Sequence, residues 1–170
     1  APKAKNFTPV KSFENTVYFV DYDMVQADIN FKRNAEMYDP KLETAASAFN
    51  EYYGGGMQSV VFQDIRESRA LAYSTYSNFG VPSKKDKPFT ATFYVGTQAD
   101  KMNDAMGAVL NLLDKMNETE KLWDISKKSI QTSIQTQRIN KEGILFAYET
   151  AQDKGLNYDI RKDIYKNIAG

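Results

Sequence analysis

Arg66 and Tyr73 are the two side chains in this sequence whose types and spacing could do chemistry. Arg66 falls near the predicted C-terminus of a helix, and Tyr73 falls on the strand predicted to follow. A helix-to-strand corner between them could therefore bring both side chains to one surface. A guanidinium and a phenol both donate hydrogen bonds and suit carbonyl oxygens. Taken alone, such residues are more often a surface arginine and a half-buried tyrosine, so both interpretations stand at this point.

Composition argues against several other kinds of site. The 170 residues include no histidine and no cysteine. Zinc hydrolase sites nearly always use histidine, and Ser–His or Cys–His nucleophiles require it, so we expect no metal or triad catalysis by this chain alone. Carboxylates could still hold magnesium or calcium, or act as an acid/base pair. The absence of cysteine leaves the cellular compartment open.

Charge and hydropathy exclude further classes. Lys plus Arg and Asp plus Glu both number 22, so the formal charge is zero and no basic excess points to nucleic acid. No apolar run is long enough to predict a membrane span, and the N-terminal residues do not resemble a signal peptide, although one could have been removed. The length is that of one domain.

The elements that must position Arg66 and Tyr73 are two helices and a strand. Asp39 and Pro40 start a helix that the glycines at 54–56 stop, and a second apolar stripe runs to about Ser68 before a strand over 71–79. The glycines could cradle a phosphate, but no Walker-type lysine follows them, so a break that lets two helices meet is favoured. Arg69 is predicted to form a salt bridge or to cap the helix end.

The remaining segments predict an α+β fold. Alternating apolar and polar residues indicate strands over 25–32 and 89–96, and a β-branched and aromatic run predicts a further strand over 16–20, paired with 25–32 as a hairpin. Helical patterns follow over 102–116, 120–139, 142–154 and 160–169, with a capping box expected over 97–100 and a helix cap at Asn117. Strands in adjacent pairs favour a two-layer sandwich of a mostly antiparallel sheet with helices on one side.

We expect residues 1–15 to be a connecting arm and residues 16–170 to form a single module. The sequence stops just after a helical pattern, with no closing strand. That ending predicts a module truncated at its C-terminus.

The stretch 49–74 reads FNEYYGGGMQSVVFQDIRESRALAYS. It resembles the GGG-x-x-S-x-L-F-x-x-L-R-E-x-x-G-L-A-Y-S segment of the pitrilysin/insulinase-type zinc metallopeptidases, which include mitochondrial processing peptidase and the core subunits of respiratory complex III. The similarity extends as a weaker pattern over most of the chain. The resemblance implies a LuxS/processing-peptidase-like metallohydrolase module.

In that family, one copy of the module carries the inverted zinc motif H-x-x-E-H, and the C-terminal copy lacks zinc ligands. The histidine-free chain is similar to the zinc-free copy, so the resemblance implies no catalytic residue and no metal ligand here, with zinc in a catalytic module in cis or in trans. The family's substrate-binding arginine and tyrosine fall, with matching separation, on Arg66 and Tyr73. Their expected role is to hold carbonyls of a peptide substrate.

One departure from the family pattern concerns the backbone. Ala70 replaces the usual glycine before Leu71, at a position where glycine would permit geometry that alanine resists. Two alternative functions stay open. One is a structural or non-catalytic partner subunit resembling the complex III core proteins. The other is a stand-alone module that binds peptides at a sheet edge.

Overall fold

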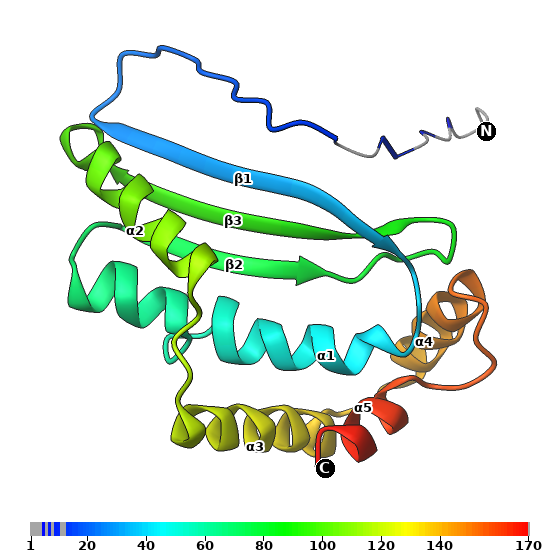
Figure 1. The fold of residues 1–170 in the computed structure, drawn as a ribbon. Helices are drawn as coiled ribbons and strands as arrows, with labels where there is room; N and C mark the ends of the chain where they lie inside the picture. Colours follow the sequence, from blue (N-terminus) through cyan, green and yellow to red (C-terminus); the bar gives the residue numbers. More distant parts are fainter. Residues whose placement is uncertain (1–4, 6, 8, 11–12, 170) are drawn as a thin grey trace.

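The computed structural model of the chain describes residues 5, 7, 9, 10 and 13–169. Three strands form one antiparallel sheet in the order β1-β3-β2, with β3 in the centre (Figure 1). They span Gln26–Met37 (β1), Ser74–Gly80 (β2) and Pro88–Gln98 (β3). The prediction of a mixed helix and sheet fold with an antiparallel sheet is confirmed, and the sheet is small.

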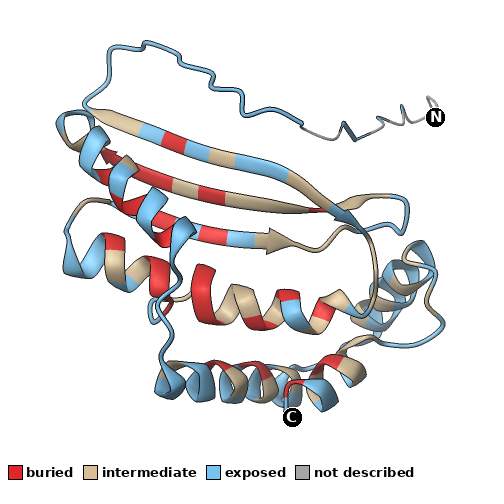
Figure 2. Cartoon of the chain, in the orientation of Figure 1, coloured by how far each residue is buried: buried red, intermediate tan, exposed pale blue. Residues whose placement is uncertain are grey.

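One face of the sheet is apolar and the other is polar. On β3 the buried side chains recur at every second position and include Phe89, Phe93 and Val95. Ile29 of β1 pairs with Val95 and therefore lies on the same face. The opposite face carries exposed polar residues such as Asp28 and remains open (Figure 2).

Helices cover the apolar face. The helical segments of the described part of the chain are α1 (Leu42–Phe49), its π-helical continuation η1 (Asn50–Gly54), the π-helix η2 (Phe62–Ser68), the 3-10 turn η3 (Ala99–Lys101), α2 (Met102–Asp114), α3 (Glu120–Thr136), α4 (Lys141–Asp153) and α5 (Arg161–Asn167). The segments η1, η2 and α2 share one hydrophobic core with the sheet. The helices α3 and α5 lie on the far side of α1 (Figure 1). None of the helices in the described part is long and apolar enough to cross a membrane.

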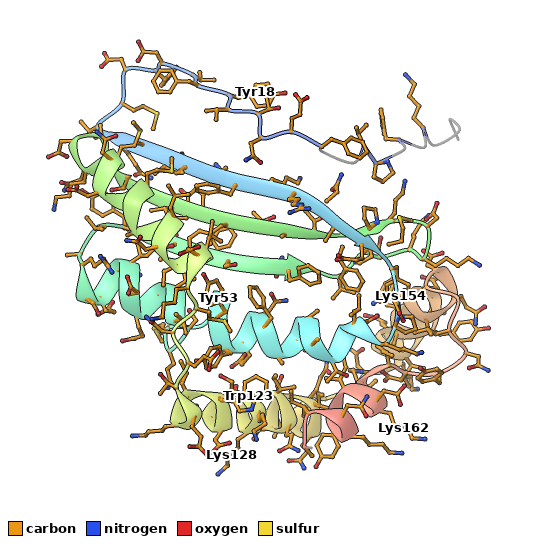
Figure 3. All side chains as sticks on the ribbon, viewed as in Figure 1. Tyr18, Tyr53, Trp123, Lys128, Lys154 and Lys162 are labelled. Atoms are coloured by element: carbon orange, nitrogen blue, oxygen red, sulfur yellow. The ribbon has the colours of Figure 1, made fainter. Side chains whose placement is uncertain are left out.

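Two consecutive tyrosines at the end of the first helix connect the layers. The Tyr53 hydroxyl donates to the Leu112 carbonyl of α2 over 2.9 Å, and its ring meets Phe93 of the sheet edge to face (Figure 3). Burial raises the pKa of Tyr53 to about 12, so this phenol stays protonated and remains a donor. The Tyr52 hydroxyl donates to the Asn117 carbonyl over 2.7 Å and fixes the link between α2 and α3.

The side chain of Asn50 covers the outer edge of β2. Its amide nitrogen donates to the Phe79 carbonyl over 3.1 Å, and its amide oxygen accepts from the Phe79 N–H over 2.7 Å. These two bonds replace those of a neighbouring strand. Edge strands are often protected in this way against pairing with another chain.

Gly54 lies against the same edge. A Cβ atom on Gly54 would stand 1.9 Å from the Ser77 carbonyl oxygen, so only glycine permits this approach of helix and strand. The glycines therefore end the helix as expected, but Gly54 allows contact with a strand rather than with a second helix. The neighbouring Gly55 has no such constraint, because its Cβ would find its nearest atom at 3.7 Å.

The strand and hairpin predicted for residues 16–20 are wrong. These residues adopt no regular structure, and Val17 and Tyr18 are 89 % and 88 % exposed. The run has the composition of a strand, but a strand also needs a partner edge and a surface to bury against. The preceding arm contacts the sheet near the far end of β1, where Asn34 donates to the Val10 carbonyl over 2.9 Å.

We predict that Gly54→Ala destabilises the protein by about 3 kcal/mol, because the new methyl group must displace the β2 backbone. Gly55→Ala is the matched control and should change the free energy of unfolding by less than about 0.5 kcal/mol. Urea unfolding followed by circular dichroism measures both variants. Equal stability of the two would show that the helix does not depend on this approach to β2.

Candidate functional site at the Arg66–Tyr73 corner

The corner between Arg66 and Tyr73 is closed by two nested backbone hydrogen bonds. The Ala70 N–H donates to the Arg66 carbonyl over 3.1 Å, and the Leu71 N–H donates to the Ile65 carbonyl over 3.0 Å. This is a Schellman-type helix ending, widened by one residue because the preceding helix is a π-helix. It reverses the chain and leads it into β2.

Such an ending requires a left-handed residue, and Ala70 fills that position with φ of 50°. At the end of α4 the same role falls to Gly155, with φ of 74°. There the Gly155 and Leu156 N–H groups donate to the Gln152 and Ala151 carbonyls over 2.9 and 2.8 Å. In the left-handed region the Cβ atom of an L-residue is too close to the backbone, whereas glycine has no Cβ and is not strained. Ala70 therefore has the left-handed backbone geometry that glycine would adopt more easily, as expected from its position before Leu71.

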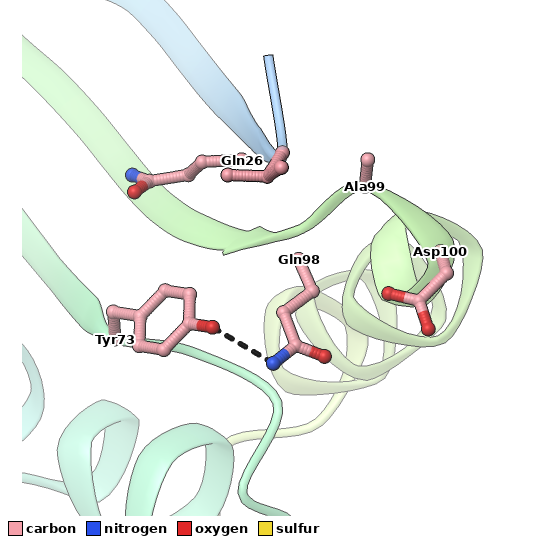
Figure 4. A pocket seen from close by; sticks show the side chains of 6 residues that line it. Gln26, Tyr73, Gln98, Ala99 and Asp100 are labelled. Carbon is pink, nitrogen blue, oxygen red and sulfur yellow. Dashed lines mark hydrogen bonds between the residues drawn. The ribbon is translucent and has the colours of Figure 1, made fainter.

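Tyr73 lies just before β2 rather than within it, since the strand starts at Ser74 and not at Leu71. Its backbone N–H donates to the Gly96 carbonyl over 2.9 Å, so its main chain is already paired with β3. The side chain is 57 % exposed. Its hydroxyl accepts a hydrogen bond from the Gln98 amide nitrogen over 2.7 Å (Figure 4).

An open cavity of about 670 Å³ adjoins the Tyr73 side chain. The other residues that line it come from the start of β1 and from the junction of β3 with α2: Val25, Gln26, Gln98, Ala99 and Asp100. The capping box expected over residues 97–100 does not form, because Thr97 belongs to β3 and donates to the Leu71 carbonyl. Gln98, the residue before η3, instead donates a hydrogen bond from its side chain to Tyr73.

Arg66 lies in η2 with its side chain 46 % exposed. Its guanidinium stands 4.9 Å from the centre of the Phe62 ring, and the nearest carboxylate, that of Glu67, is 4.0 Å away. No hydrogen bond joins Arg66 to Tyr73 within the described residues, and Arg66 does not line the cavity. Arg66 and Tyr73 thus lie on the same corner, each accessible to solvent, with no hydrogen bond between them in the described part of the chain.

The neighbouring charges pair with each other. Arg69 donates from Nε to the Asp64 carboxylate over 2.5 Å, which confirms the salt bridge predicted for it. The bond to Asp64 raises the pKa of the Arg69 guanidinium. Asp64 is therefore engaged with Arg69.

The described residues do not fit a zinc site. They contain no group of three or more carboxylate, histidine or cysteine side chains close enough to share a metal ion. Histidine and cysteine are absent from the whole sequence, so the ligands that zinc prefers are missing.

The fold and the corner define an α+β domain without zinc ligands. Residues 1–143 match the family described as the peptidase M16 inactive domain. The chain therefore belongs to this family, the zinc-free domain of the insulinase- and pitrilysin-like peptidases.

Individual relatives agree with that assignment. An uncharacterised zinc protease of Bacillus subtilis, YmxG, is 33% identical over 88 residues, which cover 50% of this chain and 21% of that protein. A peptidase M16 inactive domain from Pseudomonas fluorescens superposes with a TM-score of 0.69 at 18% identity, over 86% of this chain and 35% of its own.

A conserved protein from Enterococcus faecalis superposes with a TM-score of 0.71 at 17% identity, covering 86% of this chain and 34% of its own. A protease from Helicobacter pylori gives a TM-score of 0.58 at 12% identity, covering 85% and 37%. The chain thus spans about a third of these solved chains and a fifth of the Bacillus protein.

We predict that Ala70→Gly stabilises the protein by about 1 kcal/mol, because glycine adopts a left-handed backbone without steric cost. The reciprocal change at the α4 ending, Gly155→Ala, should destabilise it by a similar amount. Chemical denaturation of the two variants and of the unsubstituted protein measures their free energies of unfolding. A loss of stability in Ala70→Gly would contradict the expected strain at this corner.

Proposed function

We propose that this domain binds an extended peptide and orients it for hydrolysis at a zinc site in another module, on the same chain or on a partner subunit. The observation that carries the proposal is the Tyr73 hydroxyl. It stands exposed beside an open cavity, on a corner whose backbone is paired with β3. Membership of a family of inactive peptidase domains supports the proposal.

Within this proposal Tyr73 and Arg66 are the substrate-binding residues. The phenol and the guanidinium would donate hydrogen bonds to main-chain carbonyl oxygens of the peptide. Donors fixed in advance next to a carbonyl that gains negative charge stabilise the transition state more than the substrate. Both side chains are accessible, so a peptide could reach them without rearrangement of the core.

The finer description of the fold is part of the same proposal. We assign residues 16–170 to one LuxS/processing-peptidase-like module of a longer polypeptide, with residues 1–15 as a connecting arm. The chain covers only about a third of the solved relatives, which supports a longer polypeptide that contains this domain, called the parent below. The catalytic zinc module would be supplied by that parent or by a partner.

The test is peptide hydrolysis by the intact parent polypeptide, with and without a zinc chelator, beside this domain alone. We expect chelator-sensitive cleavage by the parent and none by the isolated domain. If the parent, supplied with zinc, cleaves no peptide even with its partner subunits present, the proposal fails. The alternative of a structural subunit like the complex III core proteins would then be preferred.

We predict that Tyr73→Phe and Arg66→Ala each lower kcat/KM of the parent by about 100-fold, the usual effect of removing one such donor. Both residues are about half exposed and belong to no core cluster, so the melting temperature of the domain should hardly change. Tyr148→Phe, at an exposed phenol on α4, is the control and should leave turnover unaffected. Unchanged turnover in both site variants would refute the assignment.

A further inference from the structure

The last three residues of β3 each hold a different part of the segment that ends in Tyr73. The Gly96 carbonyl accepts from the Tyr73 N–H, and the Thr97 hydroxyl donates to the Leu71 carbonyl. The Gln98 amide nitrogen then donates to the Tyr73 hydroxyl over 2.7 Å (Figure 4). The first two contacts fix the main chain before the tyrosine, and the third fixes the tip of its side chain.

The direction of this third hydrogen bond matters for what the phenol can do. A phenol has one hydrogen to donate and lone pairs that accept, whereas an amide nitrogen only donates. When Gln98 donates to the phenol oxygen, it occupies a lone pair and leaves the phenolic hydrogen unused. That hydrogen remains available to donate to a second group in the cavity.

Other polar residues of the cavity are differently engaged. The Gln26 amide nitrogen donates to Asp28 over 3.1 Å, on the polar face of the sheet. Within the described part of the chain, Asp100 forms no hydrogen bond with the phenol. Gln98 is therefore the side chain that the structure places on the Tyr73 hydroxyl.

We propose that Gln98 is a positioning residue for Tyr73. Its amide holds the ring in one orientation and, by donating, directs the phenolic hydrogen toward the carbonyl oxygen of a bound peptide. This inference rests on the proposed function, because it assumes that Tyr73 donates to the substrate. It adds a residue that contacts the tyrosine and need not contact the peptide.

The test uses three substitutions in the intact parent, assayed by peptide hydrolysis. Gln98→Lys keeps only a donor, Gln98→Met keeps the length without a hydrogen-bonding group, and Gln98→Glu supplies only an acceptor. We expect Lys to retain kcat within about twofold and Met to lower kcat about tenfold with little change in KM. Glu should lower kcat further, because its carboxylate accepts a hydrogen bond from the phenol and the phenolic hydrogen is then no longer available to the peptide.

The same three substitutions in a Tyr73→Phe background separate positioning from other effects. Without the Tyr73 hydroxyl, Gln98→Met should have no further effect on kcat. Any difference in kcat that remains between Gln98→Lys and Gln98→Glu is then due to their charge. Gln135→Met is the matched control, because the Gln135 amide donates to the Tyr165 hydroxyl over 2.5 Å in a similar exposed pair. We expect that control to keep full activity.

Two results would overturn the inference in distinguishable ways. If Tyr73→Phe lowers turnover but Gln98→Met and Gln98→Glu match the parent, Gln98 does not position the phenol and the proposed function survives. If Tyr73→Phe itself leaves turnover unchanged, the proposed function fails and this inference fails with it. Melting temperatures of the Gln98 variants, expected to equal that of the parent, exclude loss of folding as the cause.

Discussion

The close approach of Gly54 to the Ser77 carbonyl is the constraint on which the arrangement around the corner depends. Because no side chain fits between them, the end of the first helix lies directly against β2. Asn50, one turn earlier, completes the contact by pairing with the Phe79 backbone. The chain that leaves Gly54 must then return to β2 within the length of η2 and the corner. The position of Arg66 and Tyr73 follows from this short return.

The end of β3 determines how precisely the corner is held. Three consecutive residues fix Leu71 and Tyr73 by main chain and side chain, and the short turn η3 leads from them into α2. Rigid elements hold a binding group better than a loop does, because packing limits the movement of its supports. Ala70 is a costly part of this corner, and its left-handed backbone is tolerated because the helix ending and β2 both determine it.

Much of this arrangement can be predicted from sequence, because the signals are local. The glycines predict the helix break, and the arginine and tyrosine fall on a predicted helix-to-strand corner that could bring them to one surface. The resemblance to the family adds that Ala70 occupies a position where glycine is usual. The contact of Gly54 with a strand and the role of Gln98 are not local. Gln98 reads as part of a helix cap, and its true partner is 25 residues away. The apolar run over 16–20 fails for the same reason, since composition gives strand propensity but not a partner.

The two pairings of β3 differ greatly in the length of chain that they enclose. The bond from Tyr94 to Asp28 of β1 spans 66 residues, whereas that from Thr75 of β2 to Tyr94 spans 19. The entropy lost on closing a loop grows with its length, so the β2–β3 pairing is the less costly one to form. The contacts between residues 71–73 and the end of β3 extend this pairing, since Gln98 lies 25 residues from Tyr73 and Thr97 lies 26 residues from Leu71. The tyrosine and its glutamine thus belong to the part of the sheet whose assembly does not require β1.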